Sequence, residues 1–317
     1  MSQFDTYSTP PHRPRTDTPN PVSFIECDTS RGPLNCTPEM FEAILDHHIM
    51  PYPLLHPLVD ANPALGIPSI HFRPLIPLIP APPLPASPIC ALSHHHSNHE
   101  LRYTLLLRGV EPAPNHTGQA WFGRPAAIYH SYDFSTGRAV WVVIKANGVL
   151  RERIQEVAVE VPWRPEQRRK LSCETVMAVL TWCEEGWGGV VRAIEGQVQA
   201  AVGYAQRVDG LDRKEGKSRD GGGEFRYKEL QRMSRLADQI GEMELVLSLA
   251  ERVVGDLAEL YNNKMKVPSV VGRMKEIARR LETRRAQIAA KGRRLENGRR
   301  LVSDAGIAAE RGSGFCV

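Results

Sequence analysis

The sequence predicts an α+β protein in which a small, mainly antiparallel sheet with helices is followed by a long helical stalk. Strand-like sequence is confined to residues 101–146. Helical periodicity dominates from residue 172 onward. Within that part, apolar residues spaced alternately by three and four extend over residues 233–261, which is typical of helices that pack along a seam. The stalk is therefore expected to be an antiparallel coiled-coil hairpin.

Composition divides the chain into four parts. Prolines recur every third residue from Pro74 to Pro83, which is the period of a polyproline II helix, so this region is expected to be extended chain whose Leu and Ile residues cover the sheet. Docking of an SH3 or WW domain is the alternative. The parts are a disordered N-terminus (1–22), an α/β domain (23–165) with a Pro-rich insertion (51–90), a helical stalk (166–300) with a charged, Gly-rich linker (207–223), and a disordered tail (301–317).

Local signals support each element in order. Thr37 suits a helix N-cap and Pro38 the first helical position, so the first helix is expected there. Strands are expected over 101–108, 126–133 and 139–146. The last two flank the sequence FSTGR, whose glycine can supply the positive φ of a short hairpin loop.

The hairpin contains a group of polar residues that resembles catalytic machinery. His130 could act as a general base and Ser131 as a nucleophile. Adjacent strand residues point to opposite faces of a sheet, so the two side chains are not expected to meet. Both faces of the next strand are apolar, which places Trp141 and Val142 in the core. We expect packing rather than catalysis, and nothing else in the sequence indicates an enzyme or a small-molecule substrate.

The C-terminal half is predicted to be helical. One long helix or two shorter ones are expected over 172–206, with the weak point at the glycines beside Trp187. A second stalk helix begins after Pro268 and is expected to pack antiparallel beside the first. The apolar seam of the first helix consists of Met233, Leu236, Ile240, Met243, Leu247, Ala250, Val254, Leu257 and Tyr261. Its weaker counterpart consists of Met274, Ile277, Leu281, Ile288 and Leu295.

The second stalk helix is strongly basic. Residues 264–300 contain thirteen Lys and Arg against three Glu. A solvated, acid-paired face is the first interpretation, and attraction to an anionic membrane surface is the second. Nucleic acid is not expected as a partner because no aromatic residue is available for base stacking in this segment. Self-association or packing with another helical partner through the stalk is expected.

Composition sets further limits. The formal net charge of +4 over 317 residues requires no polyanionic partner. No run of about 18 apolar residues and no secretory h-region occur, so a cytoplasmic location is expected. Six cysteines without a C-x-x-C pair are expected to be reduced thiols. No cofactor is expected.

Metal-ligand chemistry is concentrated in one short cluster, formed by His94, His95, His96 and His99. Imidazole nitrogens bind zinc, copper or nickel near neutral pH. The cluster lies in a Pro-flanked loop without a nearby Cys or Asp, and such a loop loses much conformational entropy on binding. These four residues are therefore weak candidates for a metal site.

Three stretches of the chain resemble the fungal CorA-like transporter domain family. They are LNCTPEMFEAILDHHIMPYPLLHPL (34–58), AAIYHSYDFSTGRAVWVVIKANGVLRERI (126–154) and LADQIGEMELVLSLAERVVGDLAELY (236–261). The resemblance implies a cytosolic α/β region that leads into long stalk helices. In full-length members it also implies two membrane helices of the magnesium or divalent-cation channel type, so those members are expected in a membrane.

The sequence departs from the family pattern near its C-terminus. The two channel-forming helices and the Gly-Met-Asn loop of CorA channels are not found, and the chain leaves the family's course around 295–301. We therefore expect the cytosolic domain of a CorA-like protein without its pore, regulatory or non-transporting as it stands, either truncated or a soluble paralogue. The alternative is a soluble coiled-coil interaction or scaffold protein with no transport role.

Overall fold

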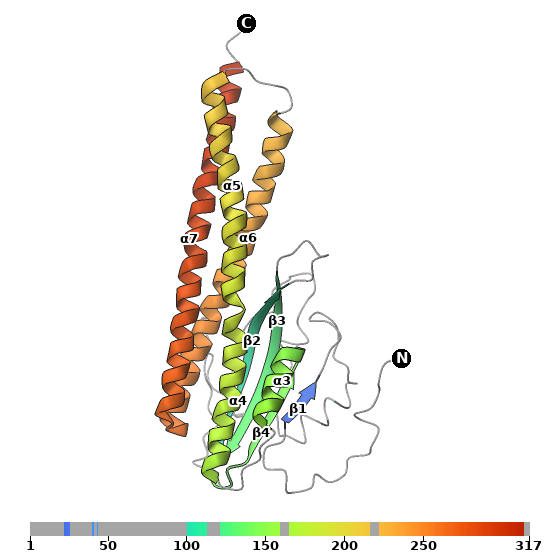
Figure 1. Cartoon of the computed structure of the whole chain (residues 1–317), viewed down its shortest axis with the longest axis vertical. Helices are drawn as coiled ribbons and strands as arrows, with labels where there is room; N and C mark the ends of the chain where they lie inside the picture. The colour runs from blue at the N-terminus through green and yellow to red at the C-terminus, as the bar shows by residue number, and fades with distance from the viewer. Residues whose placement is uncertain are drawn as a thin grey trace, which may run out of the picture. The chain divides into compact units, whose positions relative to one another are not determined.

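A computed structural model shows how these elements are arranged (Figure 1). The chain forms two compact units. The first, here called the sheet unit, comprises Met1–Leu107, Arg124–Trp182 and Glu259–Val271. The second, the helix unit, comprises Arg108–Gly123, Cys183–Ala258 and Gly272–Val317. The structure describes residues 22–25, 40, 43, 100–112, 121–158, 165–215 and 222–313.

A four-stranded mixed sheet confirms the α+β class. The strands have the order β1-β4-β3-β2, with β1 parallel and β3 antiparallel to β4. β1 was not predicted, because a four-residue segment beside a Pro-rich region has too little sequence to show a strand period. The bounds are β1 Val22–Ile25, β2 Glu100–Pro112, β3 Trp121–Asp133 and β4 Ala139–Ile144.

The β3–β4 hairpin has the predicted turn chemistry. Gly137 has a φ of 69° and its N–H donates to the carbonyl of Asp133 at 2.8 Å. The Asp133 carboxylate also accepts hydrogen bonds from Ser135 and Thr136. Desolvation by burial is the largest single influence on Asp133 and raises its pKa, but the hydrogen bonds from Ser135 and Thr136 together outweigh it, so the pKa is lowered.

Both faces of the hairpin are buried. His130 is paired with Trp141 across β3 and β4, and Tyr129 is paired with Val142 one residue along, on the opposite face. All four side chains are buried. The prediction that Trp141 and Val142 are core residues is confirmed.

Helices α3 (Gly148–Ala158) and α4 (Pro165–Glu185) follow the sheet. The side chain of Asn147 caps α3 by accepting the backbone N–H of Leu150 at 2.8 Å. The guanidinium of Arg151 in α3 lies 5.7 Å from the centre of the Phe24 ring in β1. The N-terminal helix predicted from Thr37 lies mostly outside the described residues, although Met40 and Ala43 are helical.

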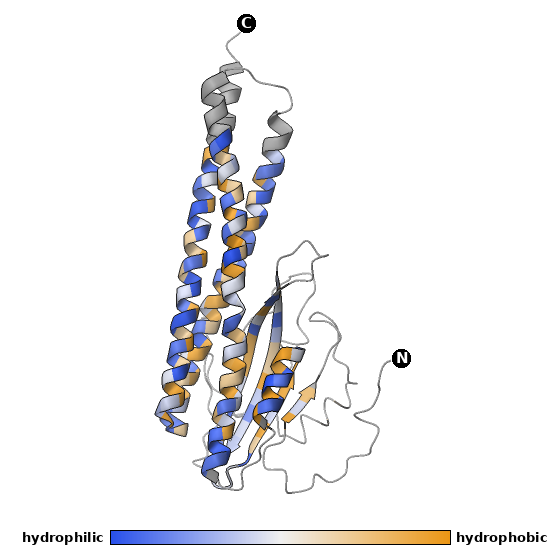
Figure 2. Cartoon of the chain, viewed as in Figure 1, coloured by the Kyte–Doolittle hydropathy of each residue, from blue (hydrophilic) through white to orange (hydrophobic). Residues whose placement is uncertain are grey.

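Three long helices make up most of the helix unit: α5 (Trp187–Glu215), α6 (Gly222–Leu260) and α7 (Pro268–Ser313). They lie side by side in Figure 1. Gly292 of α7 packs against Ile240 of α6, and Gly298 packs against Met233, so α6 and α7 are antiparallel. Figure 2 shows hydrophobic residues recurring along helices that are otherwise hydrophilic. Every residue of both predicted seams is buried.

The helices are interrupted and extended at positions that only partly match the predictions. α4 and α5 are separated at Gly186, which is the predicted weak point. α5 continues to Glu215, through half of the predicted linker 207–223, and α7 continues to Ser313, through most of the predicted tail 301–317. Extending an existing helix costs far less than starting one, and the charged residues of both segments are adequate helix formers. The Pro-rich insertion lies outside the described residues.

Candidate functional site

The sheet unit contains a buried polar cluster centred on His130. The Nε2 atom of His130 lies 2.8 Å from the hydroxyl oxygen of Ser172. Ser172 belongs to α4, so this contact joins the helix to the central strand β3. Both side chains are buried. Ser172 follows His130 by 42 residues, and no spacing in the sequence indicated this partner.

Aromatic rings surround the His130 imidazole. The ring centre of Trp141 lies 4.0 Å away and that of Tyr103 lies 4.9 Å away. The Tyr103 hydroxyl is hydrogen-bonded to that of Tyr261 at 2.8 Å. Tyr261 begins a π-helical turn (η2, Tyr261–Met265) that connects α6 to α7. The connection between the two long helices therefore packs in the sheet unit.

Burial keeps this cluster uncharged near neutral pH. It lowers the pKa of His130 to about 3, because an imidazolium would lose its hydration there. It raises the pKa values of Tyr103 and Tyr261, and it raises the pKa of the Cys173 thiol to about 12. The Nδ1 atom of His130 has no hydrogen-bond partner among the described residues.

The geometry argues against catalysis by this cluster. The distance between His130 and Ser172 would suit a general base and its nucleophile. However, the imidazole is 0% exposed and the serine 1%, so a substrate cannot reach either group in this structure. Ser131 donates to the Glu100 carboxylate at 2.7 Å instead of meeting His130. The prediction that His130 and Ser131 point to opposite faces is confirmed.

Metal-ligand groups do not gather in the described part of the chain. Among those residues, no three His, Cys, Asp or Glu side chains are placed to hold a metal ion. The candidates His94, His95, His96 and His99 lie outside the described residues. Cys173 and Cys183 are free and buried, and burial raises the pKa of the Cys183 thiol to about 12, so neither is poised as a thiolate ligand.

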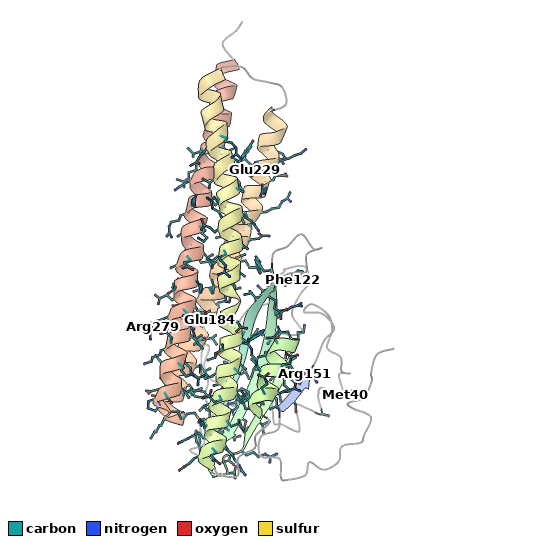
Figure 3. All side chains as sticks on the ribbon, in the orientation of Figure 1. Met40, Phe122, Arg151, Glu184, Glu229 and Arg279 are labelled. Carbon is teal, nitrogen blue, oxygen red and sulfur yellow. The ribbon has the colours of Figure 1, made fainter. Side chains whose placement is uncertain are left out.

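The helix unit contains a ladder of ion pairs along the basic helix α7. Glu184 at the end of α4 lies 3.6 Å from Arg280. Glu195 of α5 binds both Lys291 and Arg294, and its pKa is lowered chiefly by the hydrogen bond from Lys291. Figure 3 labels Glu184. The predicted pairing of α7 with acidic residues is therefore present, but part of it comes from α4 and α5 rather than from α6.

An ion pair between Glu251 and Arg285 joins α6 to α7, as the predicted hairpin requires. Glu251 of α6 accepts a hydrogen bond from Arg285 of α7 at 2.9 Å. Both side chains are partly exposed, so the pair is expected to contribute no more than about 1 kcal/mol to stability. The buried seams, rather than the ion pairs, hold this hairpin together.

Comparison with known proteins gives the family. The sequence profile of the CorA-like transporters matches residues 5–206, which is well over half of the chain. The chain belongs to the CorA-like transporter family. A comparison with curated protein sequences gives no match. CorA-like proteins are a family of transporters rather than of enzymes, which agrees with the inaccessible His130 cluster.

The match covers the sheet and its helices in this CorA-like chain. Residues 5–206 include all four strands, α3, α4 and most of α5, but neither α6 nor α7. Two of the three stretches that indicated the family, 34–58 and 126–154, lie within the match, and the stretch 236–261 lies beyond it. Among the helices that the structure describes, none contains a sufficiently long hydrophobic stretch to span a bilayer.

Proposed function

We propose that this CorA-like chain is the regulatory, non-pore part of a system that transports magnesium or another divalent cation. The observation that carries the proposal is the family match, because it includes the whole four-stranded sheet and the helix α4 that packs on it. The matched region therefore includes most of the sheet unit and its hydrophobic core, and the family's description relates this region to transport.

The connection between α6 and α7 supports a regulatory role. Residues Glu259–Val271 belong to the sheet unit, and both long helices continue from there. Tyr261 lies at the centre of this connection and is bonded to Tyr103 of β2. A displacement along α6 or α7 would change the packing of Tyr261, and through it the packing on the sheet.

A reconstituted transport assay tests the proposal. A CorA-type magnesium channel in proteoliposomes would be measured with a fluorescent magnesium indicator, with and without the purified full chain on the outer side. We expect the chain to change the rate of magnesium entry in a saturable way, and to produce no flux in proteoliposomes that contain it alone. An unchanged rate at all concentrations of the chain would contradict the regulatory role.

The alternative is a helical interaction or scaffold protein, and exposed side chains on α6 support it. Tyr227 is 62% exposed and Leu245 is 48% exposed on this helix, so both side chains are accessible to a partner. Sedimentation of the chain would reveal self-association. Concentration-dependent assembly that is lost in Leu245→Asp, together with an unchanged magnesium flux, would favour the scaffold role.

Attraction of residues 264–300 to an anionic membrane surface is a weaker proposal. Much of the charge of α7 is already paired within the helix unit, including Arg280, Arg285 and Lys291. The remaining attraction should be screened by salt. Binding to anionic vesicles at low ionic strength that disappears in a high-salt wash would support it.

A further inference from the structure

The ladder of ion pairs along α7 has a gap opposite Gly188. α5 runs parallel to α7, so acids and bases meet in register: Glu184 with Arg280 at one end, and Glu195 with Lys291 further on. Between these two pairs, Gly188 of α5 faces Arg284 of α7. The gap is therefore a position where a cation lacks the acidic partner that its neighbours have.

Two guanidinium groups converge on this position. A Cβ atom built on Gly188 would lie 3.3 Å from Nη2 of Arg284 and 3.9 Å from Nη1 of Arg192. Arg192 follows Gly188 by one helical turn on α5, so both cations reach the same spot from neighbouring helices. The nearest atoms are the ends of flexible side chains, so a residue larger than glycine at position 188 would have to displace the Arg284 guanidinium slightly.

No carboxylate in the described residues neutralises these two groups. Arg284 donates to the neutral amide oxygen of Gln287 at 3.3 Å. Arg192 is exposed and has no ion pair within the described chain. Glu184 and Glu195 are engaged with other cations. Two close positive charges repel each other unless an anion lies between them.

We propose that Arg192 and Arg284 form an oxyanion-binding site at Gly188, and that its ligand is a phosphate group. The planar guanidinium presents paired N–H donors that match phosphate oxygens, and two of them can neutralise a dianion. Both guanidinium groups lie beside the Gly188 backbone, so one ligand placed there can reach both. This inference uses only the helix unit and does not depend on the regulatory function proposed above.

Calorimetric titration of the full chain with inorganic phosphate tests the site, with ionic strength held constant by sodium chloride. We expect saturable binding that weakens about tenfold or more in Arg284→Gln and in Arg192→Gln, because each loses a charge-assisted contact. Arg293→Gln is the matched control, since it removes an equal charge from an exposed position of α7. Equal weakening in Arg284→Gln and Arg293→Gln would overturn the site.

A second test places an aspartate at the site, as a substitute for the phosphate, and compares it with a matched control variant. Gly188→Asp should abolish phosphate binding and raise the melting temperature in phosphate-free buffer. Gly196→Asp, on the same helix with nothing within 4 Å of an added Cβ atom, should do neither. Circular dichroism would confirm that both variants fold. Phosphate binding to Gly188→Asp with wild-type affinity would overturn the proposal.

The phosphate group could come from a soluble compound or from a lipid headgroup, and vesicles distinguish the two. Phosphatidylcholine vesicles with and without phosphatidic acid would be sedimented with the chain. Binding that requires phosphatidic acid, competes with free phosphate and is lost in Arg284→Gln assigns a lipid. Saturable binding of free phosphate without binding to these vesicles assigns a soluble phosphate compound. If the wild-type chain binds neither probe, there is no such site.

Discussion

The hydroxyl oxygens of Tyr103 and Tyr261 lie 2.8 Å apart, although 158 residues separate the two tyrosines in the chain. Both side chains are buried, and their rings meet edge to face with centroids 6.1 Å apart. The pair joins the connection between α6 and α7 to the edge strand β2. Because burial raises both pKa values, the pair stays neutral and its hydrogen bond is maintained over the physiological pH range.

Removing the hydroxyl group of one of these tyrosines should lower the free energy of unfolding by more than half as much as removing both. Tyr103→Phe should lower the free energy of unfolding by about 1–3 kcal/mol, because Tyr261 then loses its buried partner. The double variant Tyr103→Phe/Tyr261→Phe should cost less than the sum of the single variants. Urea denaturation measures all three, with Tyr227→Phe as an exposed control of negligible effect. Strictly additive losses would show that the two hydroxyls do not interact.

Acidification should destabilise the protein through His130. The folded pKa is about 3 and the ordinary value is 6.5, so between these limits the unfolded chain binds a proton that the folded chain excludes. Stability is then fully present above pH 6.5 and falls by about 1.4 kcal/mol per pH unit as the pH decreases toward 3. Denaturation at pH 7 and pH 5 should show this loss.

The contribution of His130 can be separated from that of the other histidines by substitution. His130→Gln retains an amide that can bond Ser172 but cannot titrate. Between pH 7 and pH 5, the unfolding free energy of this variant should change less steeply with pH than that of the wild type. The difference should be about 1.4 kcal/mol per pH unit, which corresponds to one proton. The same slope in both proteins would mean that His130 is accessible to protons in the folded state.

Trp141 should be the more costly of the two paired core residues to truncate. Trp141→Ala should destabilise by about 3–5 kcal/mol, because the large cavity cannot collapse fully. His130→Ala should cost about 2–3 kcal/mol, because Ser172 would lose its partner. A loss below about 0.5 kcal/mol for His130→Ala, typical of surface positions, would contradict the buried placement.

The burial of the α6 seam can be tested by the same substitution at two leucines, one buried and one exposed. Leu247 is 0% exposed and Leu245, two residues earlier, is 48% exposed. Leu247→Asp should lower stability by several kcal/mol because it buries an unpaired carboxylate, and addition of Ile240→Asp should unfold the hairpin. Leu245→Asp should change stability by less than about 1 kcal/mol. Thermal melts followed by circular dichroism compare them; similar melting temperatures for the two Leu variants would mean that the seam is not buried.

The break between α4 and α5 requires glycine at position 186, because there is no space there for a side chain. A Cβ atom on Gly186 would lie 2.1 Å from the carbonyl oxygen of Val110, which is backbone and cannot move aside easily. Gly186→Ala should therefore destabilise by about 1–3 kcal/mol. Gly189→Ala, with nothing within 4 Å of the added atom, should stabilise by about 0.5–1 kcal/mol. Chemical denaturation gives both values, and stabilisation by Gly186→Ala would rule out the close contact.

Elements with a regular local signal could be predicted from the sequence. The three-four spacing identified all nine residues of the first seam, eight in α6 and Tyr261 at the start of η2, and each of them is buried. Gly137 indicated the hairpin turn, and the alternation around Trp141 indicated a strand covered on both faces. The family, too, could be recognised from short stretches of sequence. These features depend on residues that are only a few positions apart in the chain, so they can be predicted from the sequence alone.

Tertiary structure alone decided which distant residues meet. Ser172 reaches His130, Tyr261 reaches Tyr103, and Arg284 reaches Gly188, and none of these pairs has a shared periodicity or a fixed spacing. It also decided that α5 and α7 run parallel, which aligns Glu195 with Lys291 and leaves the gap at Gly188. Local sequence determines the conformation and the apolar face of each segment, whereas the contacts between faces depend on how all of the helices and strands pack together.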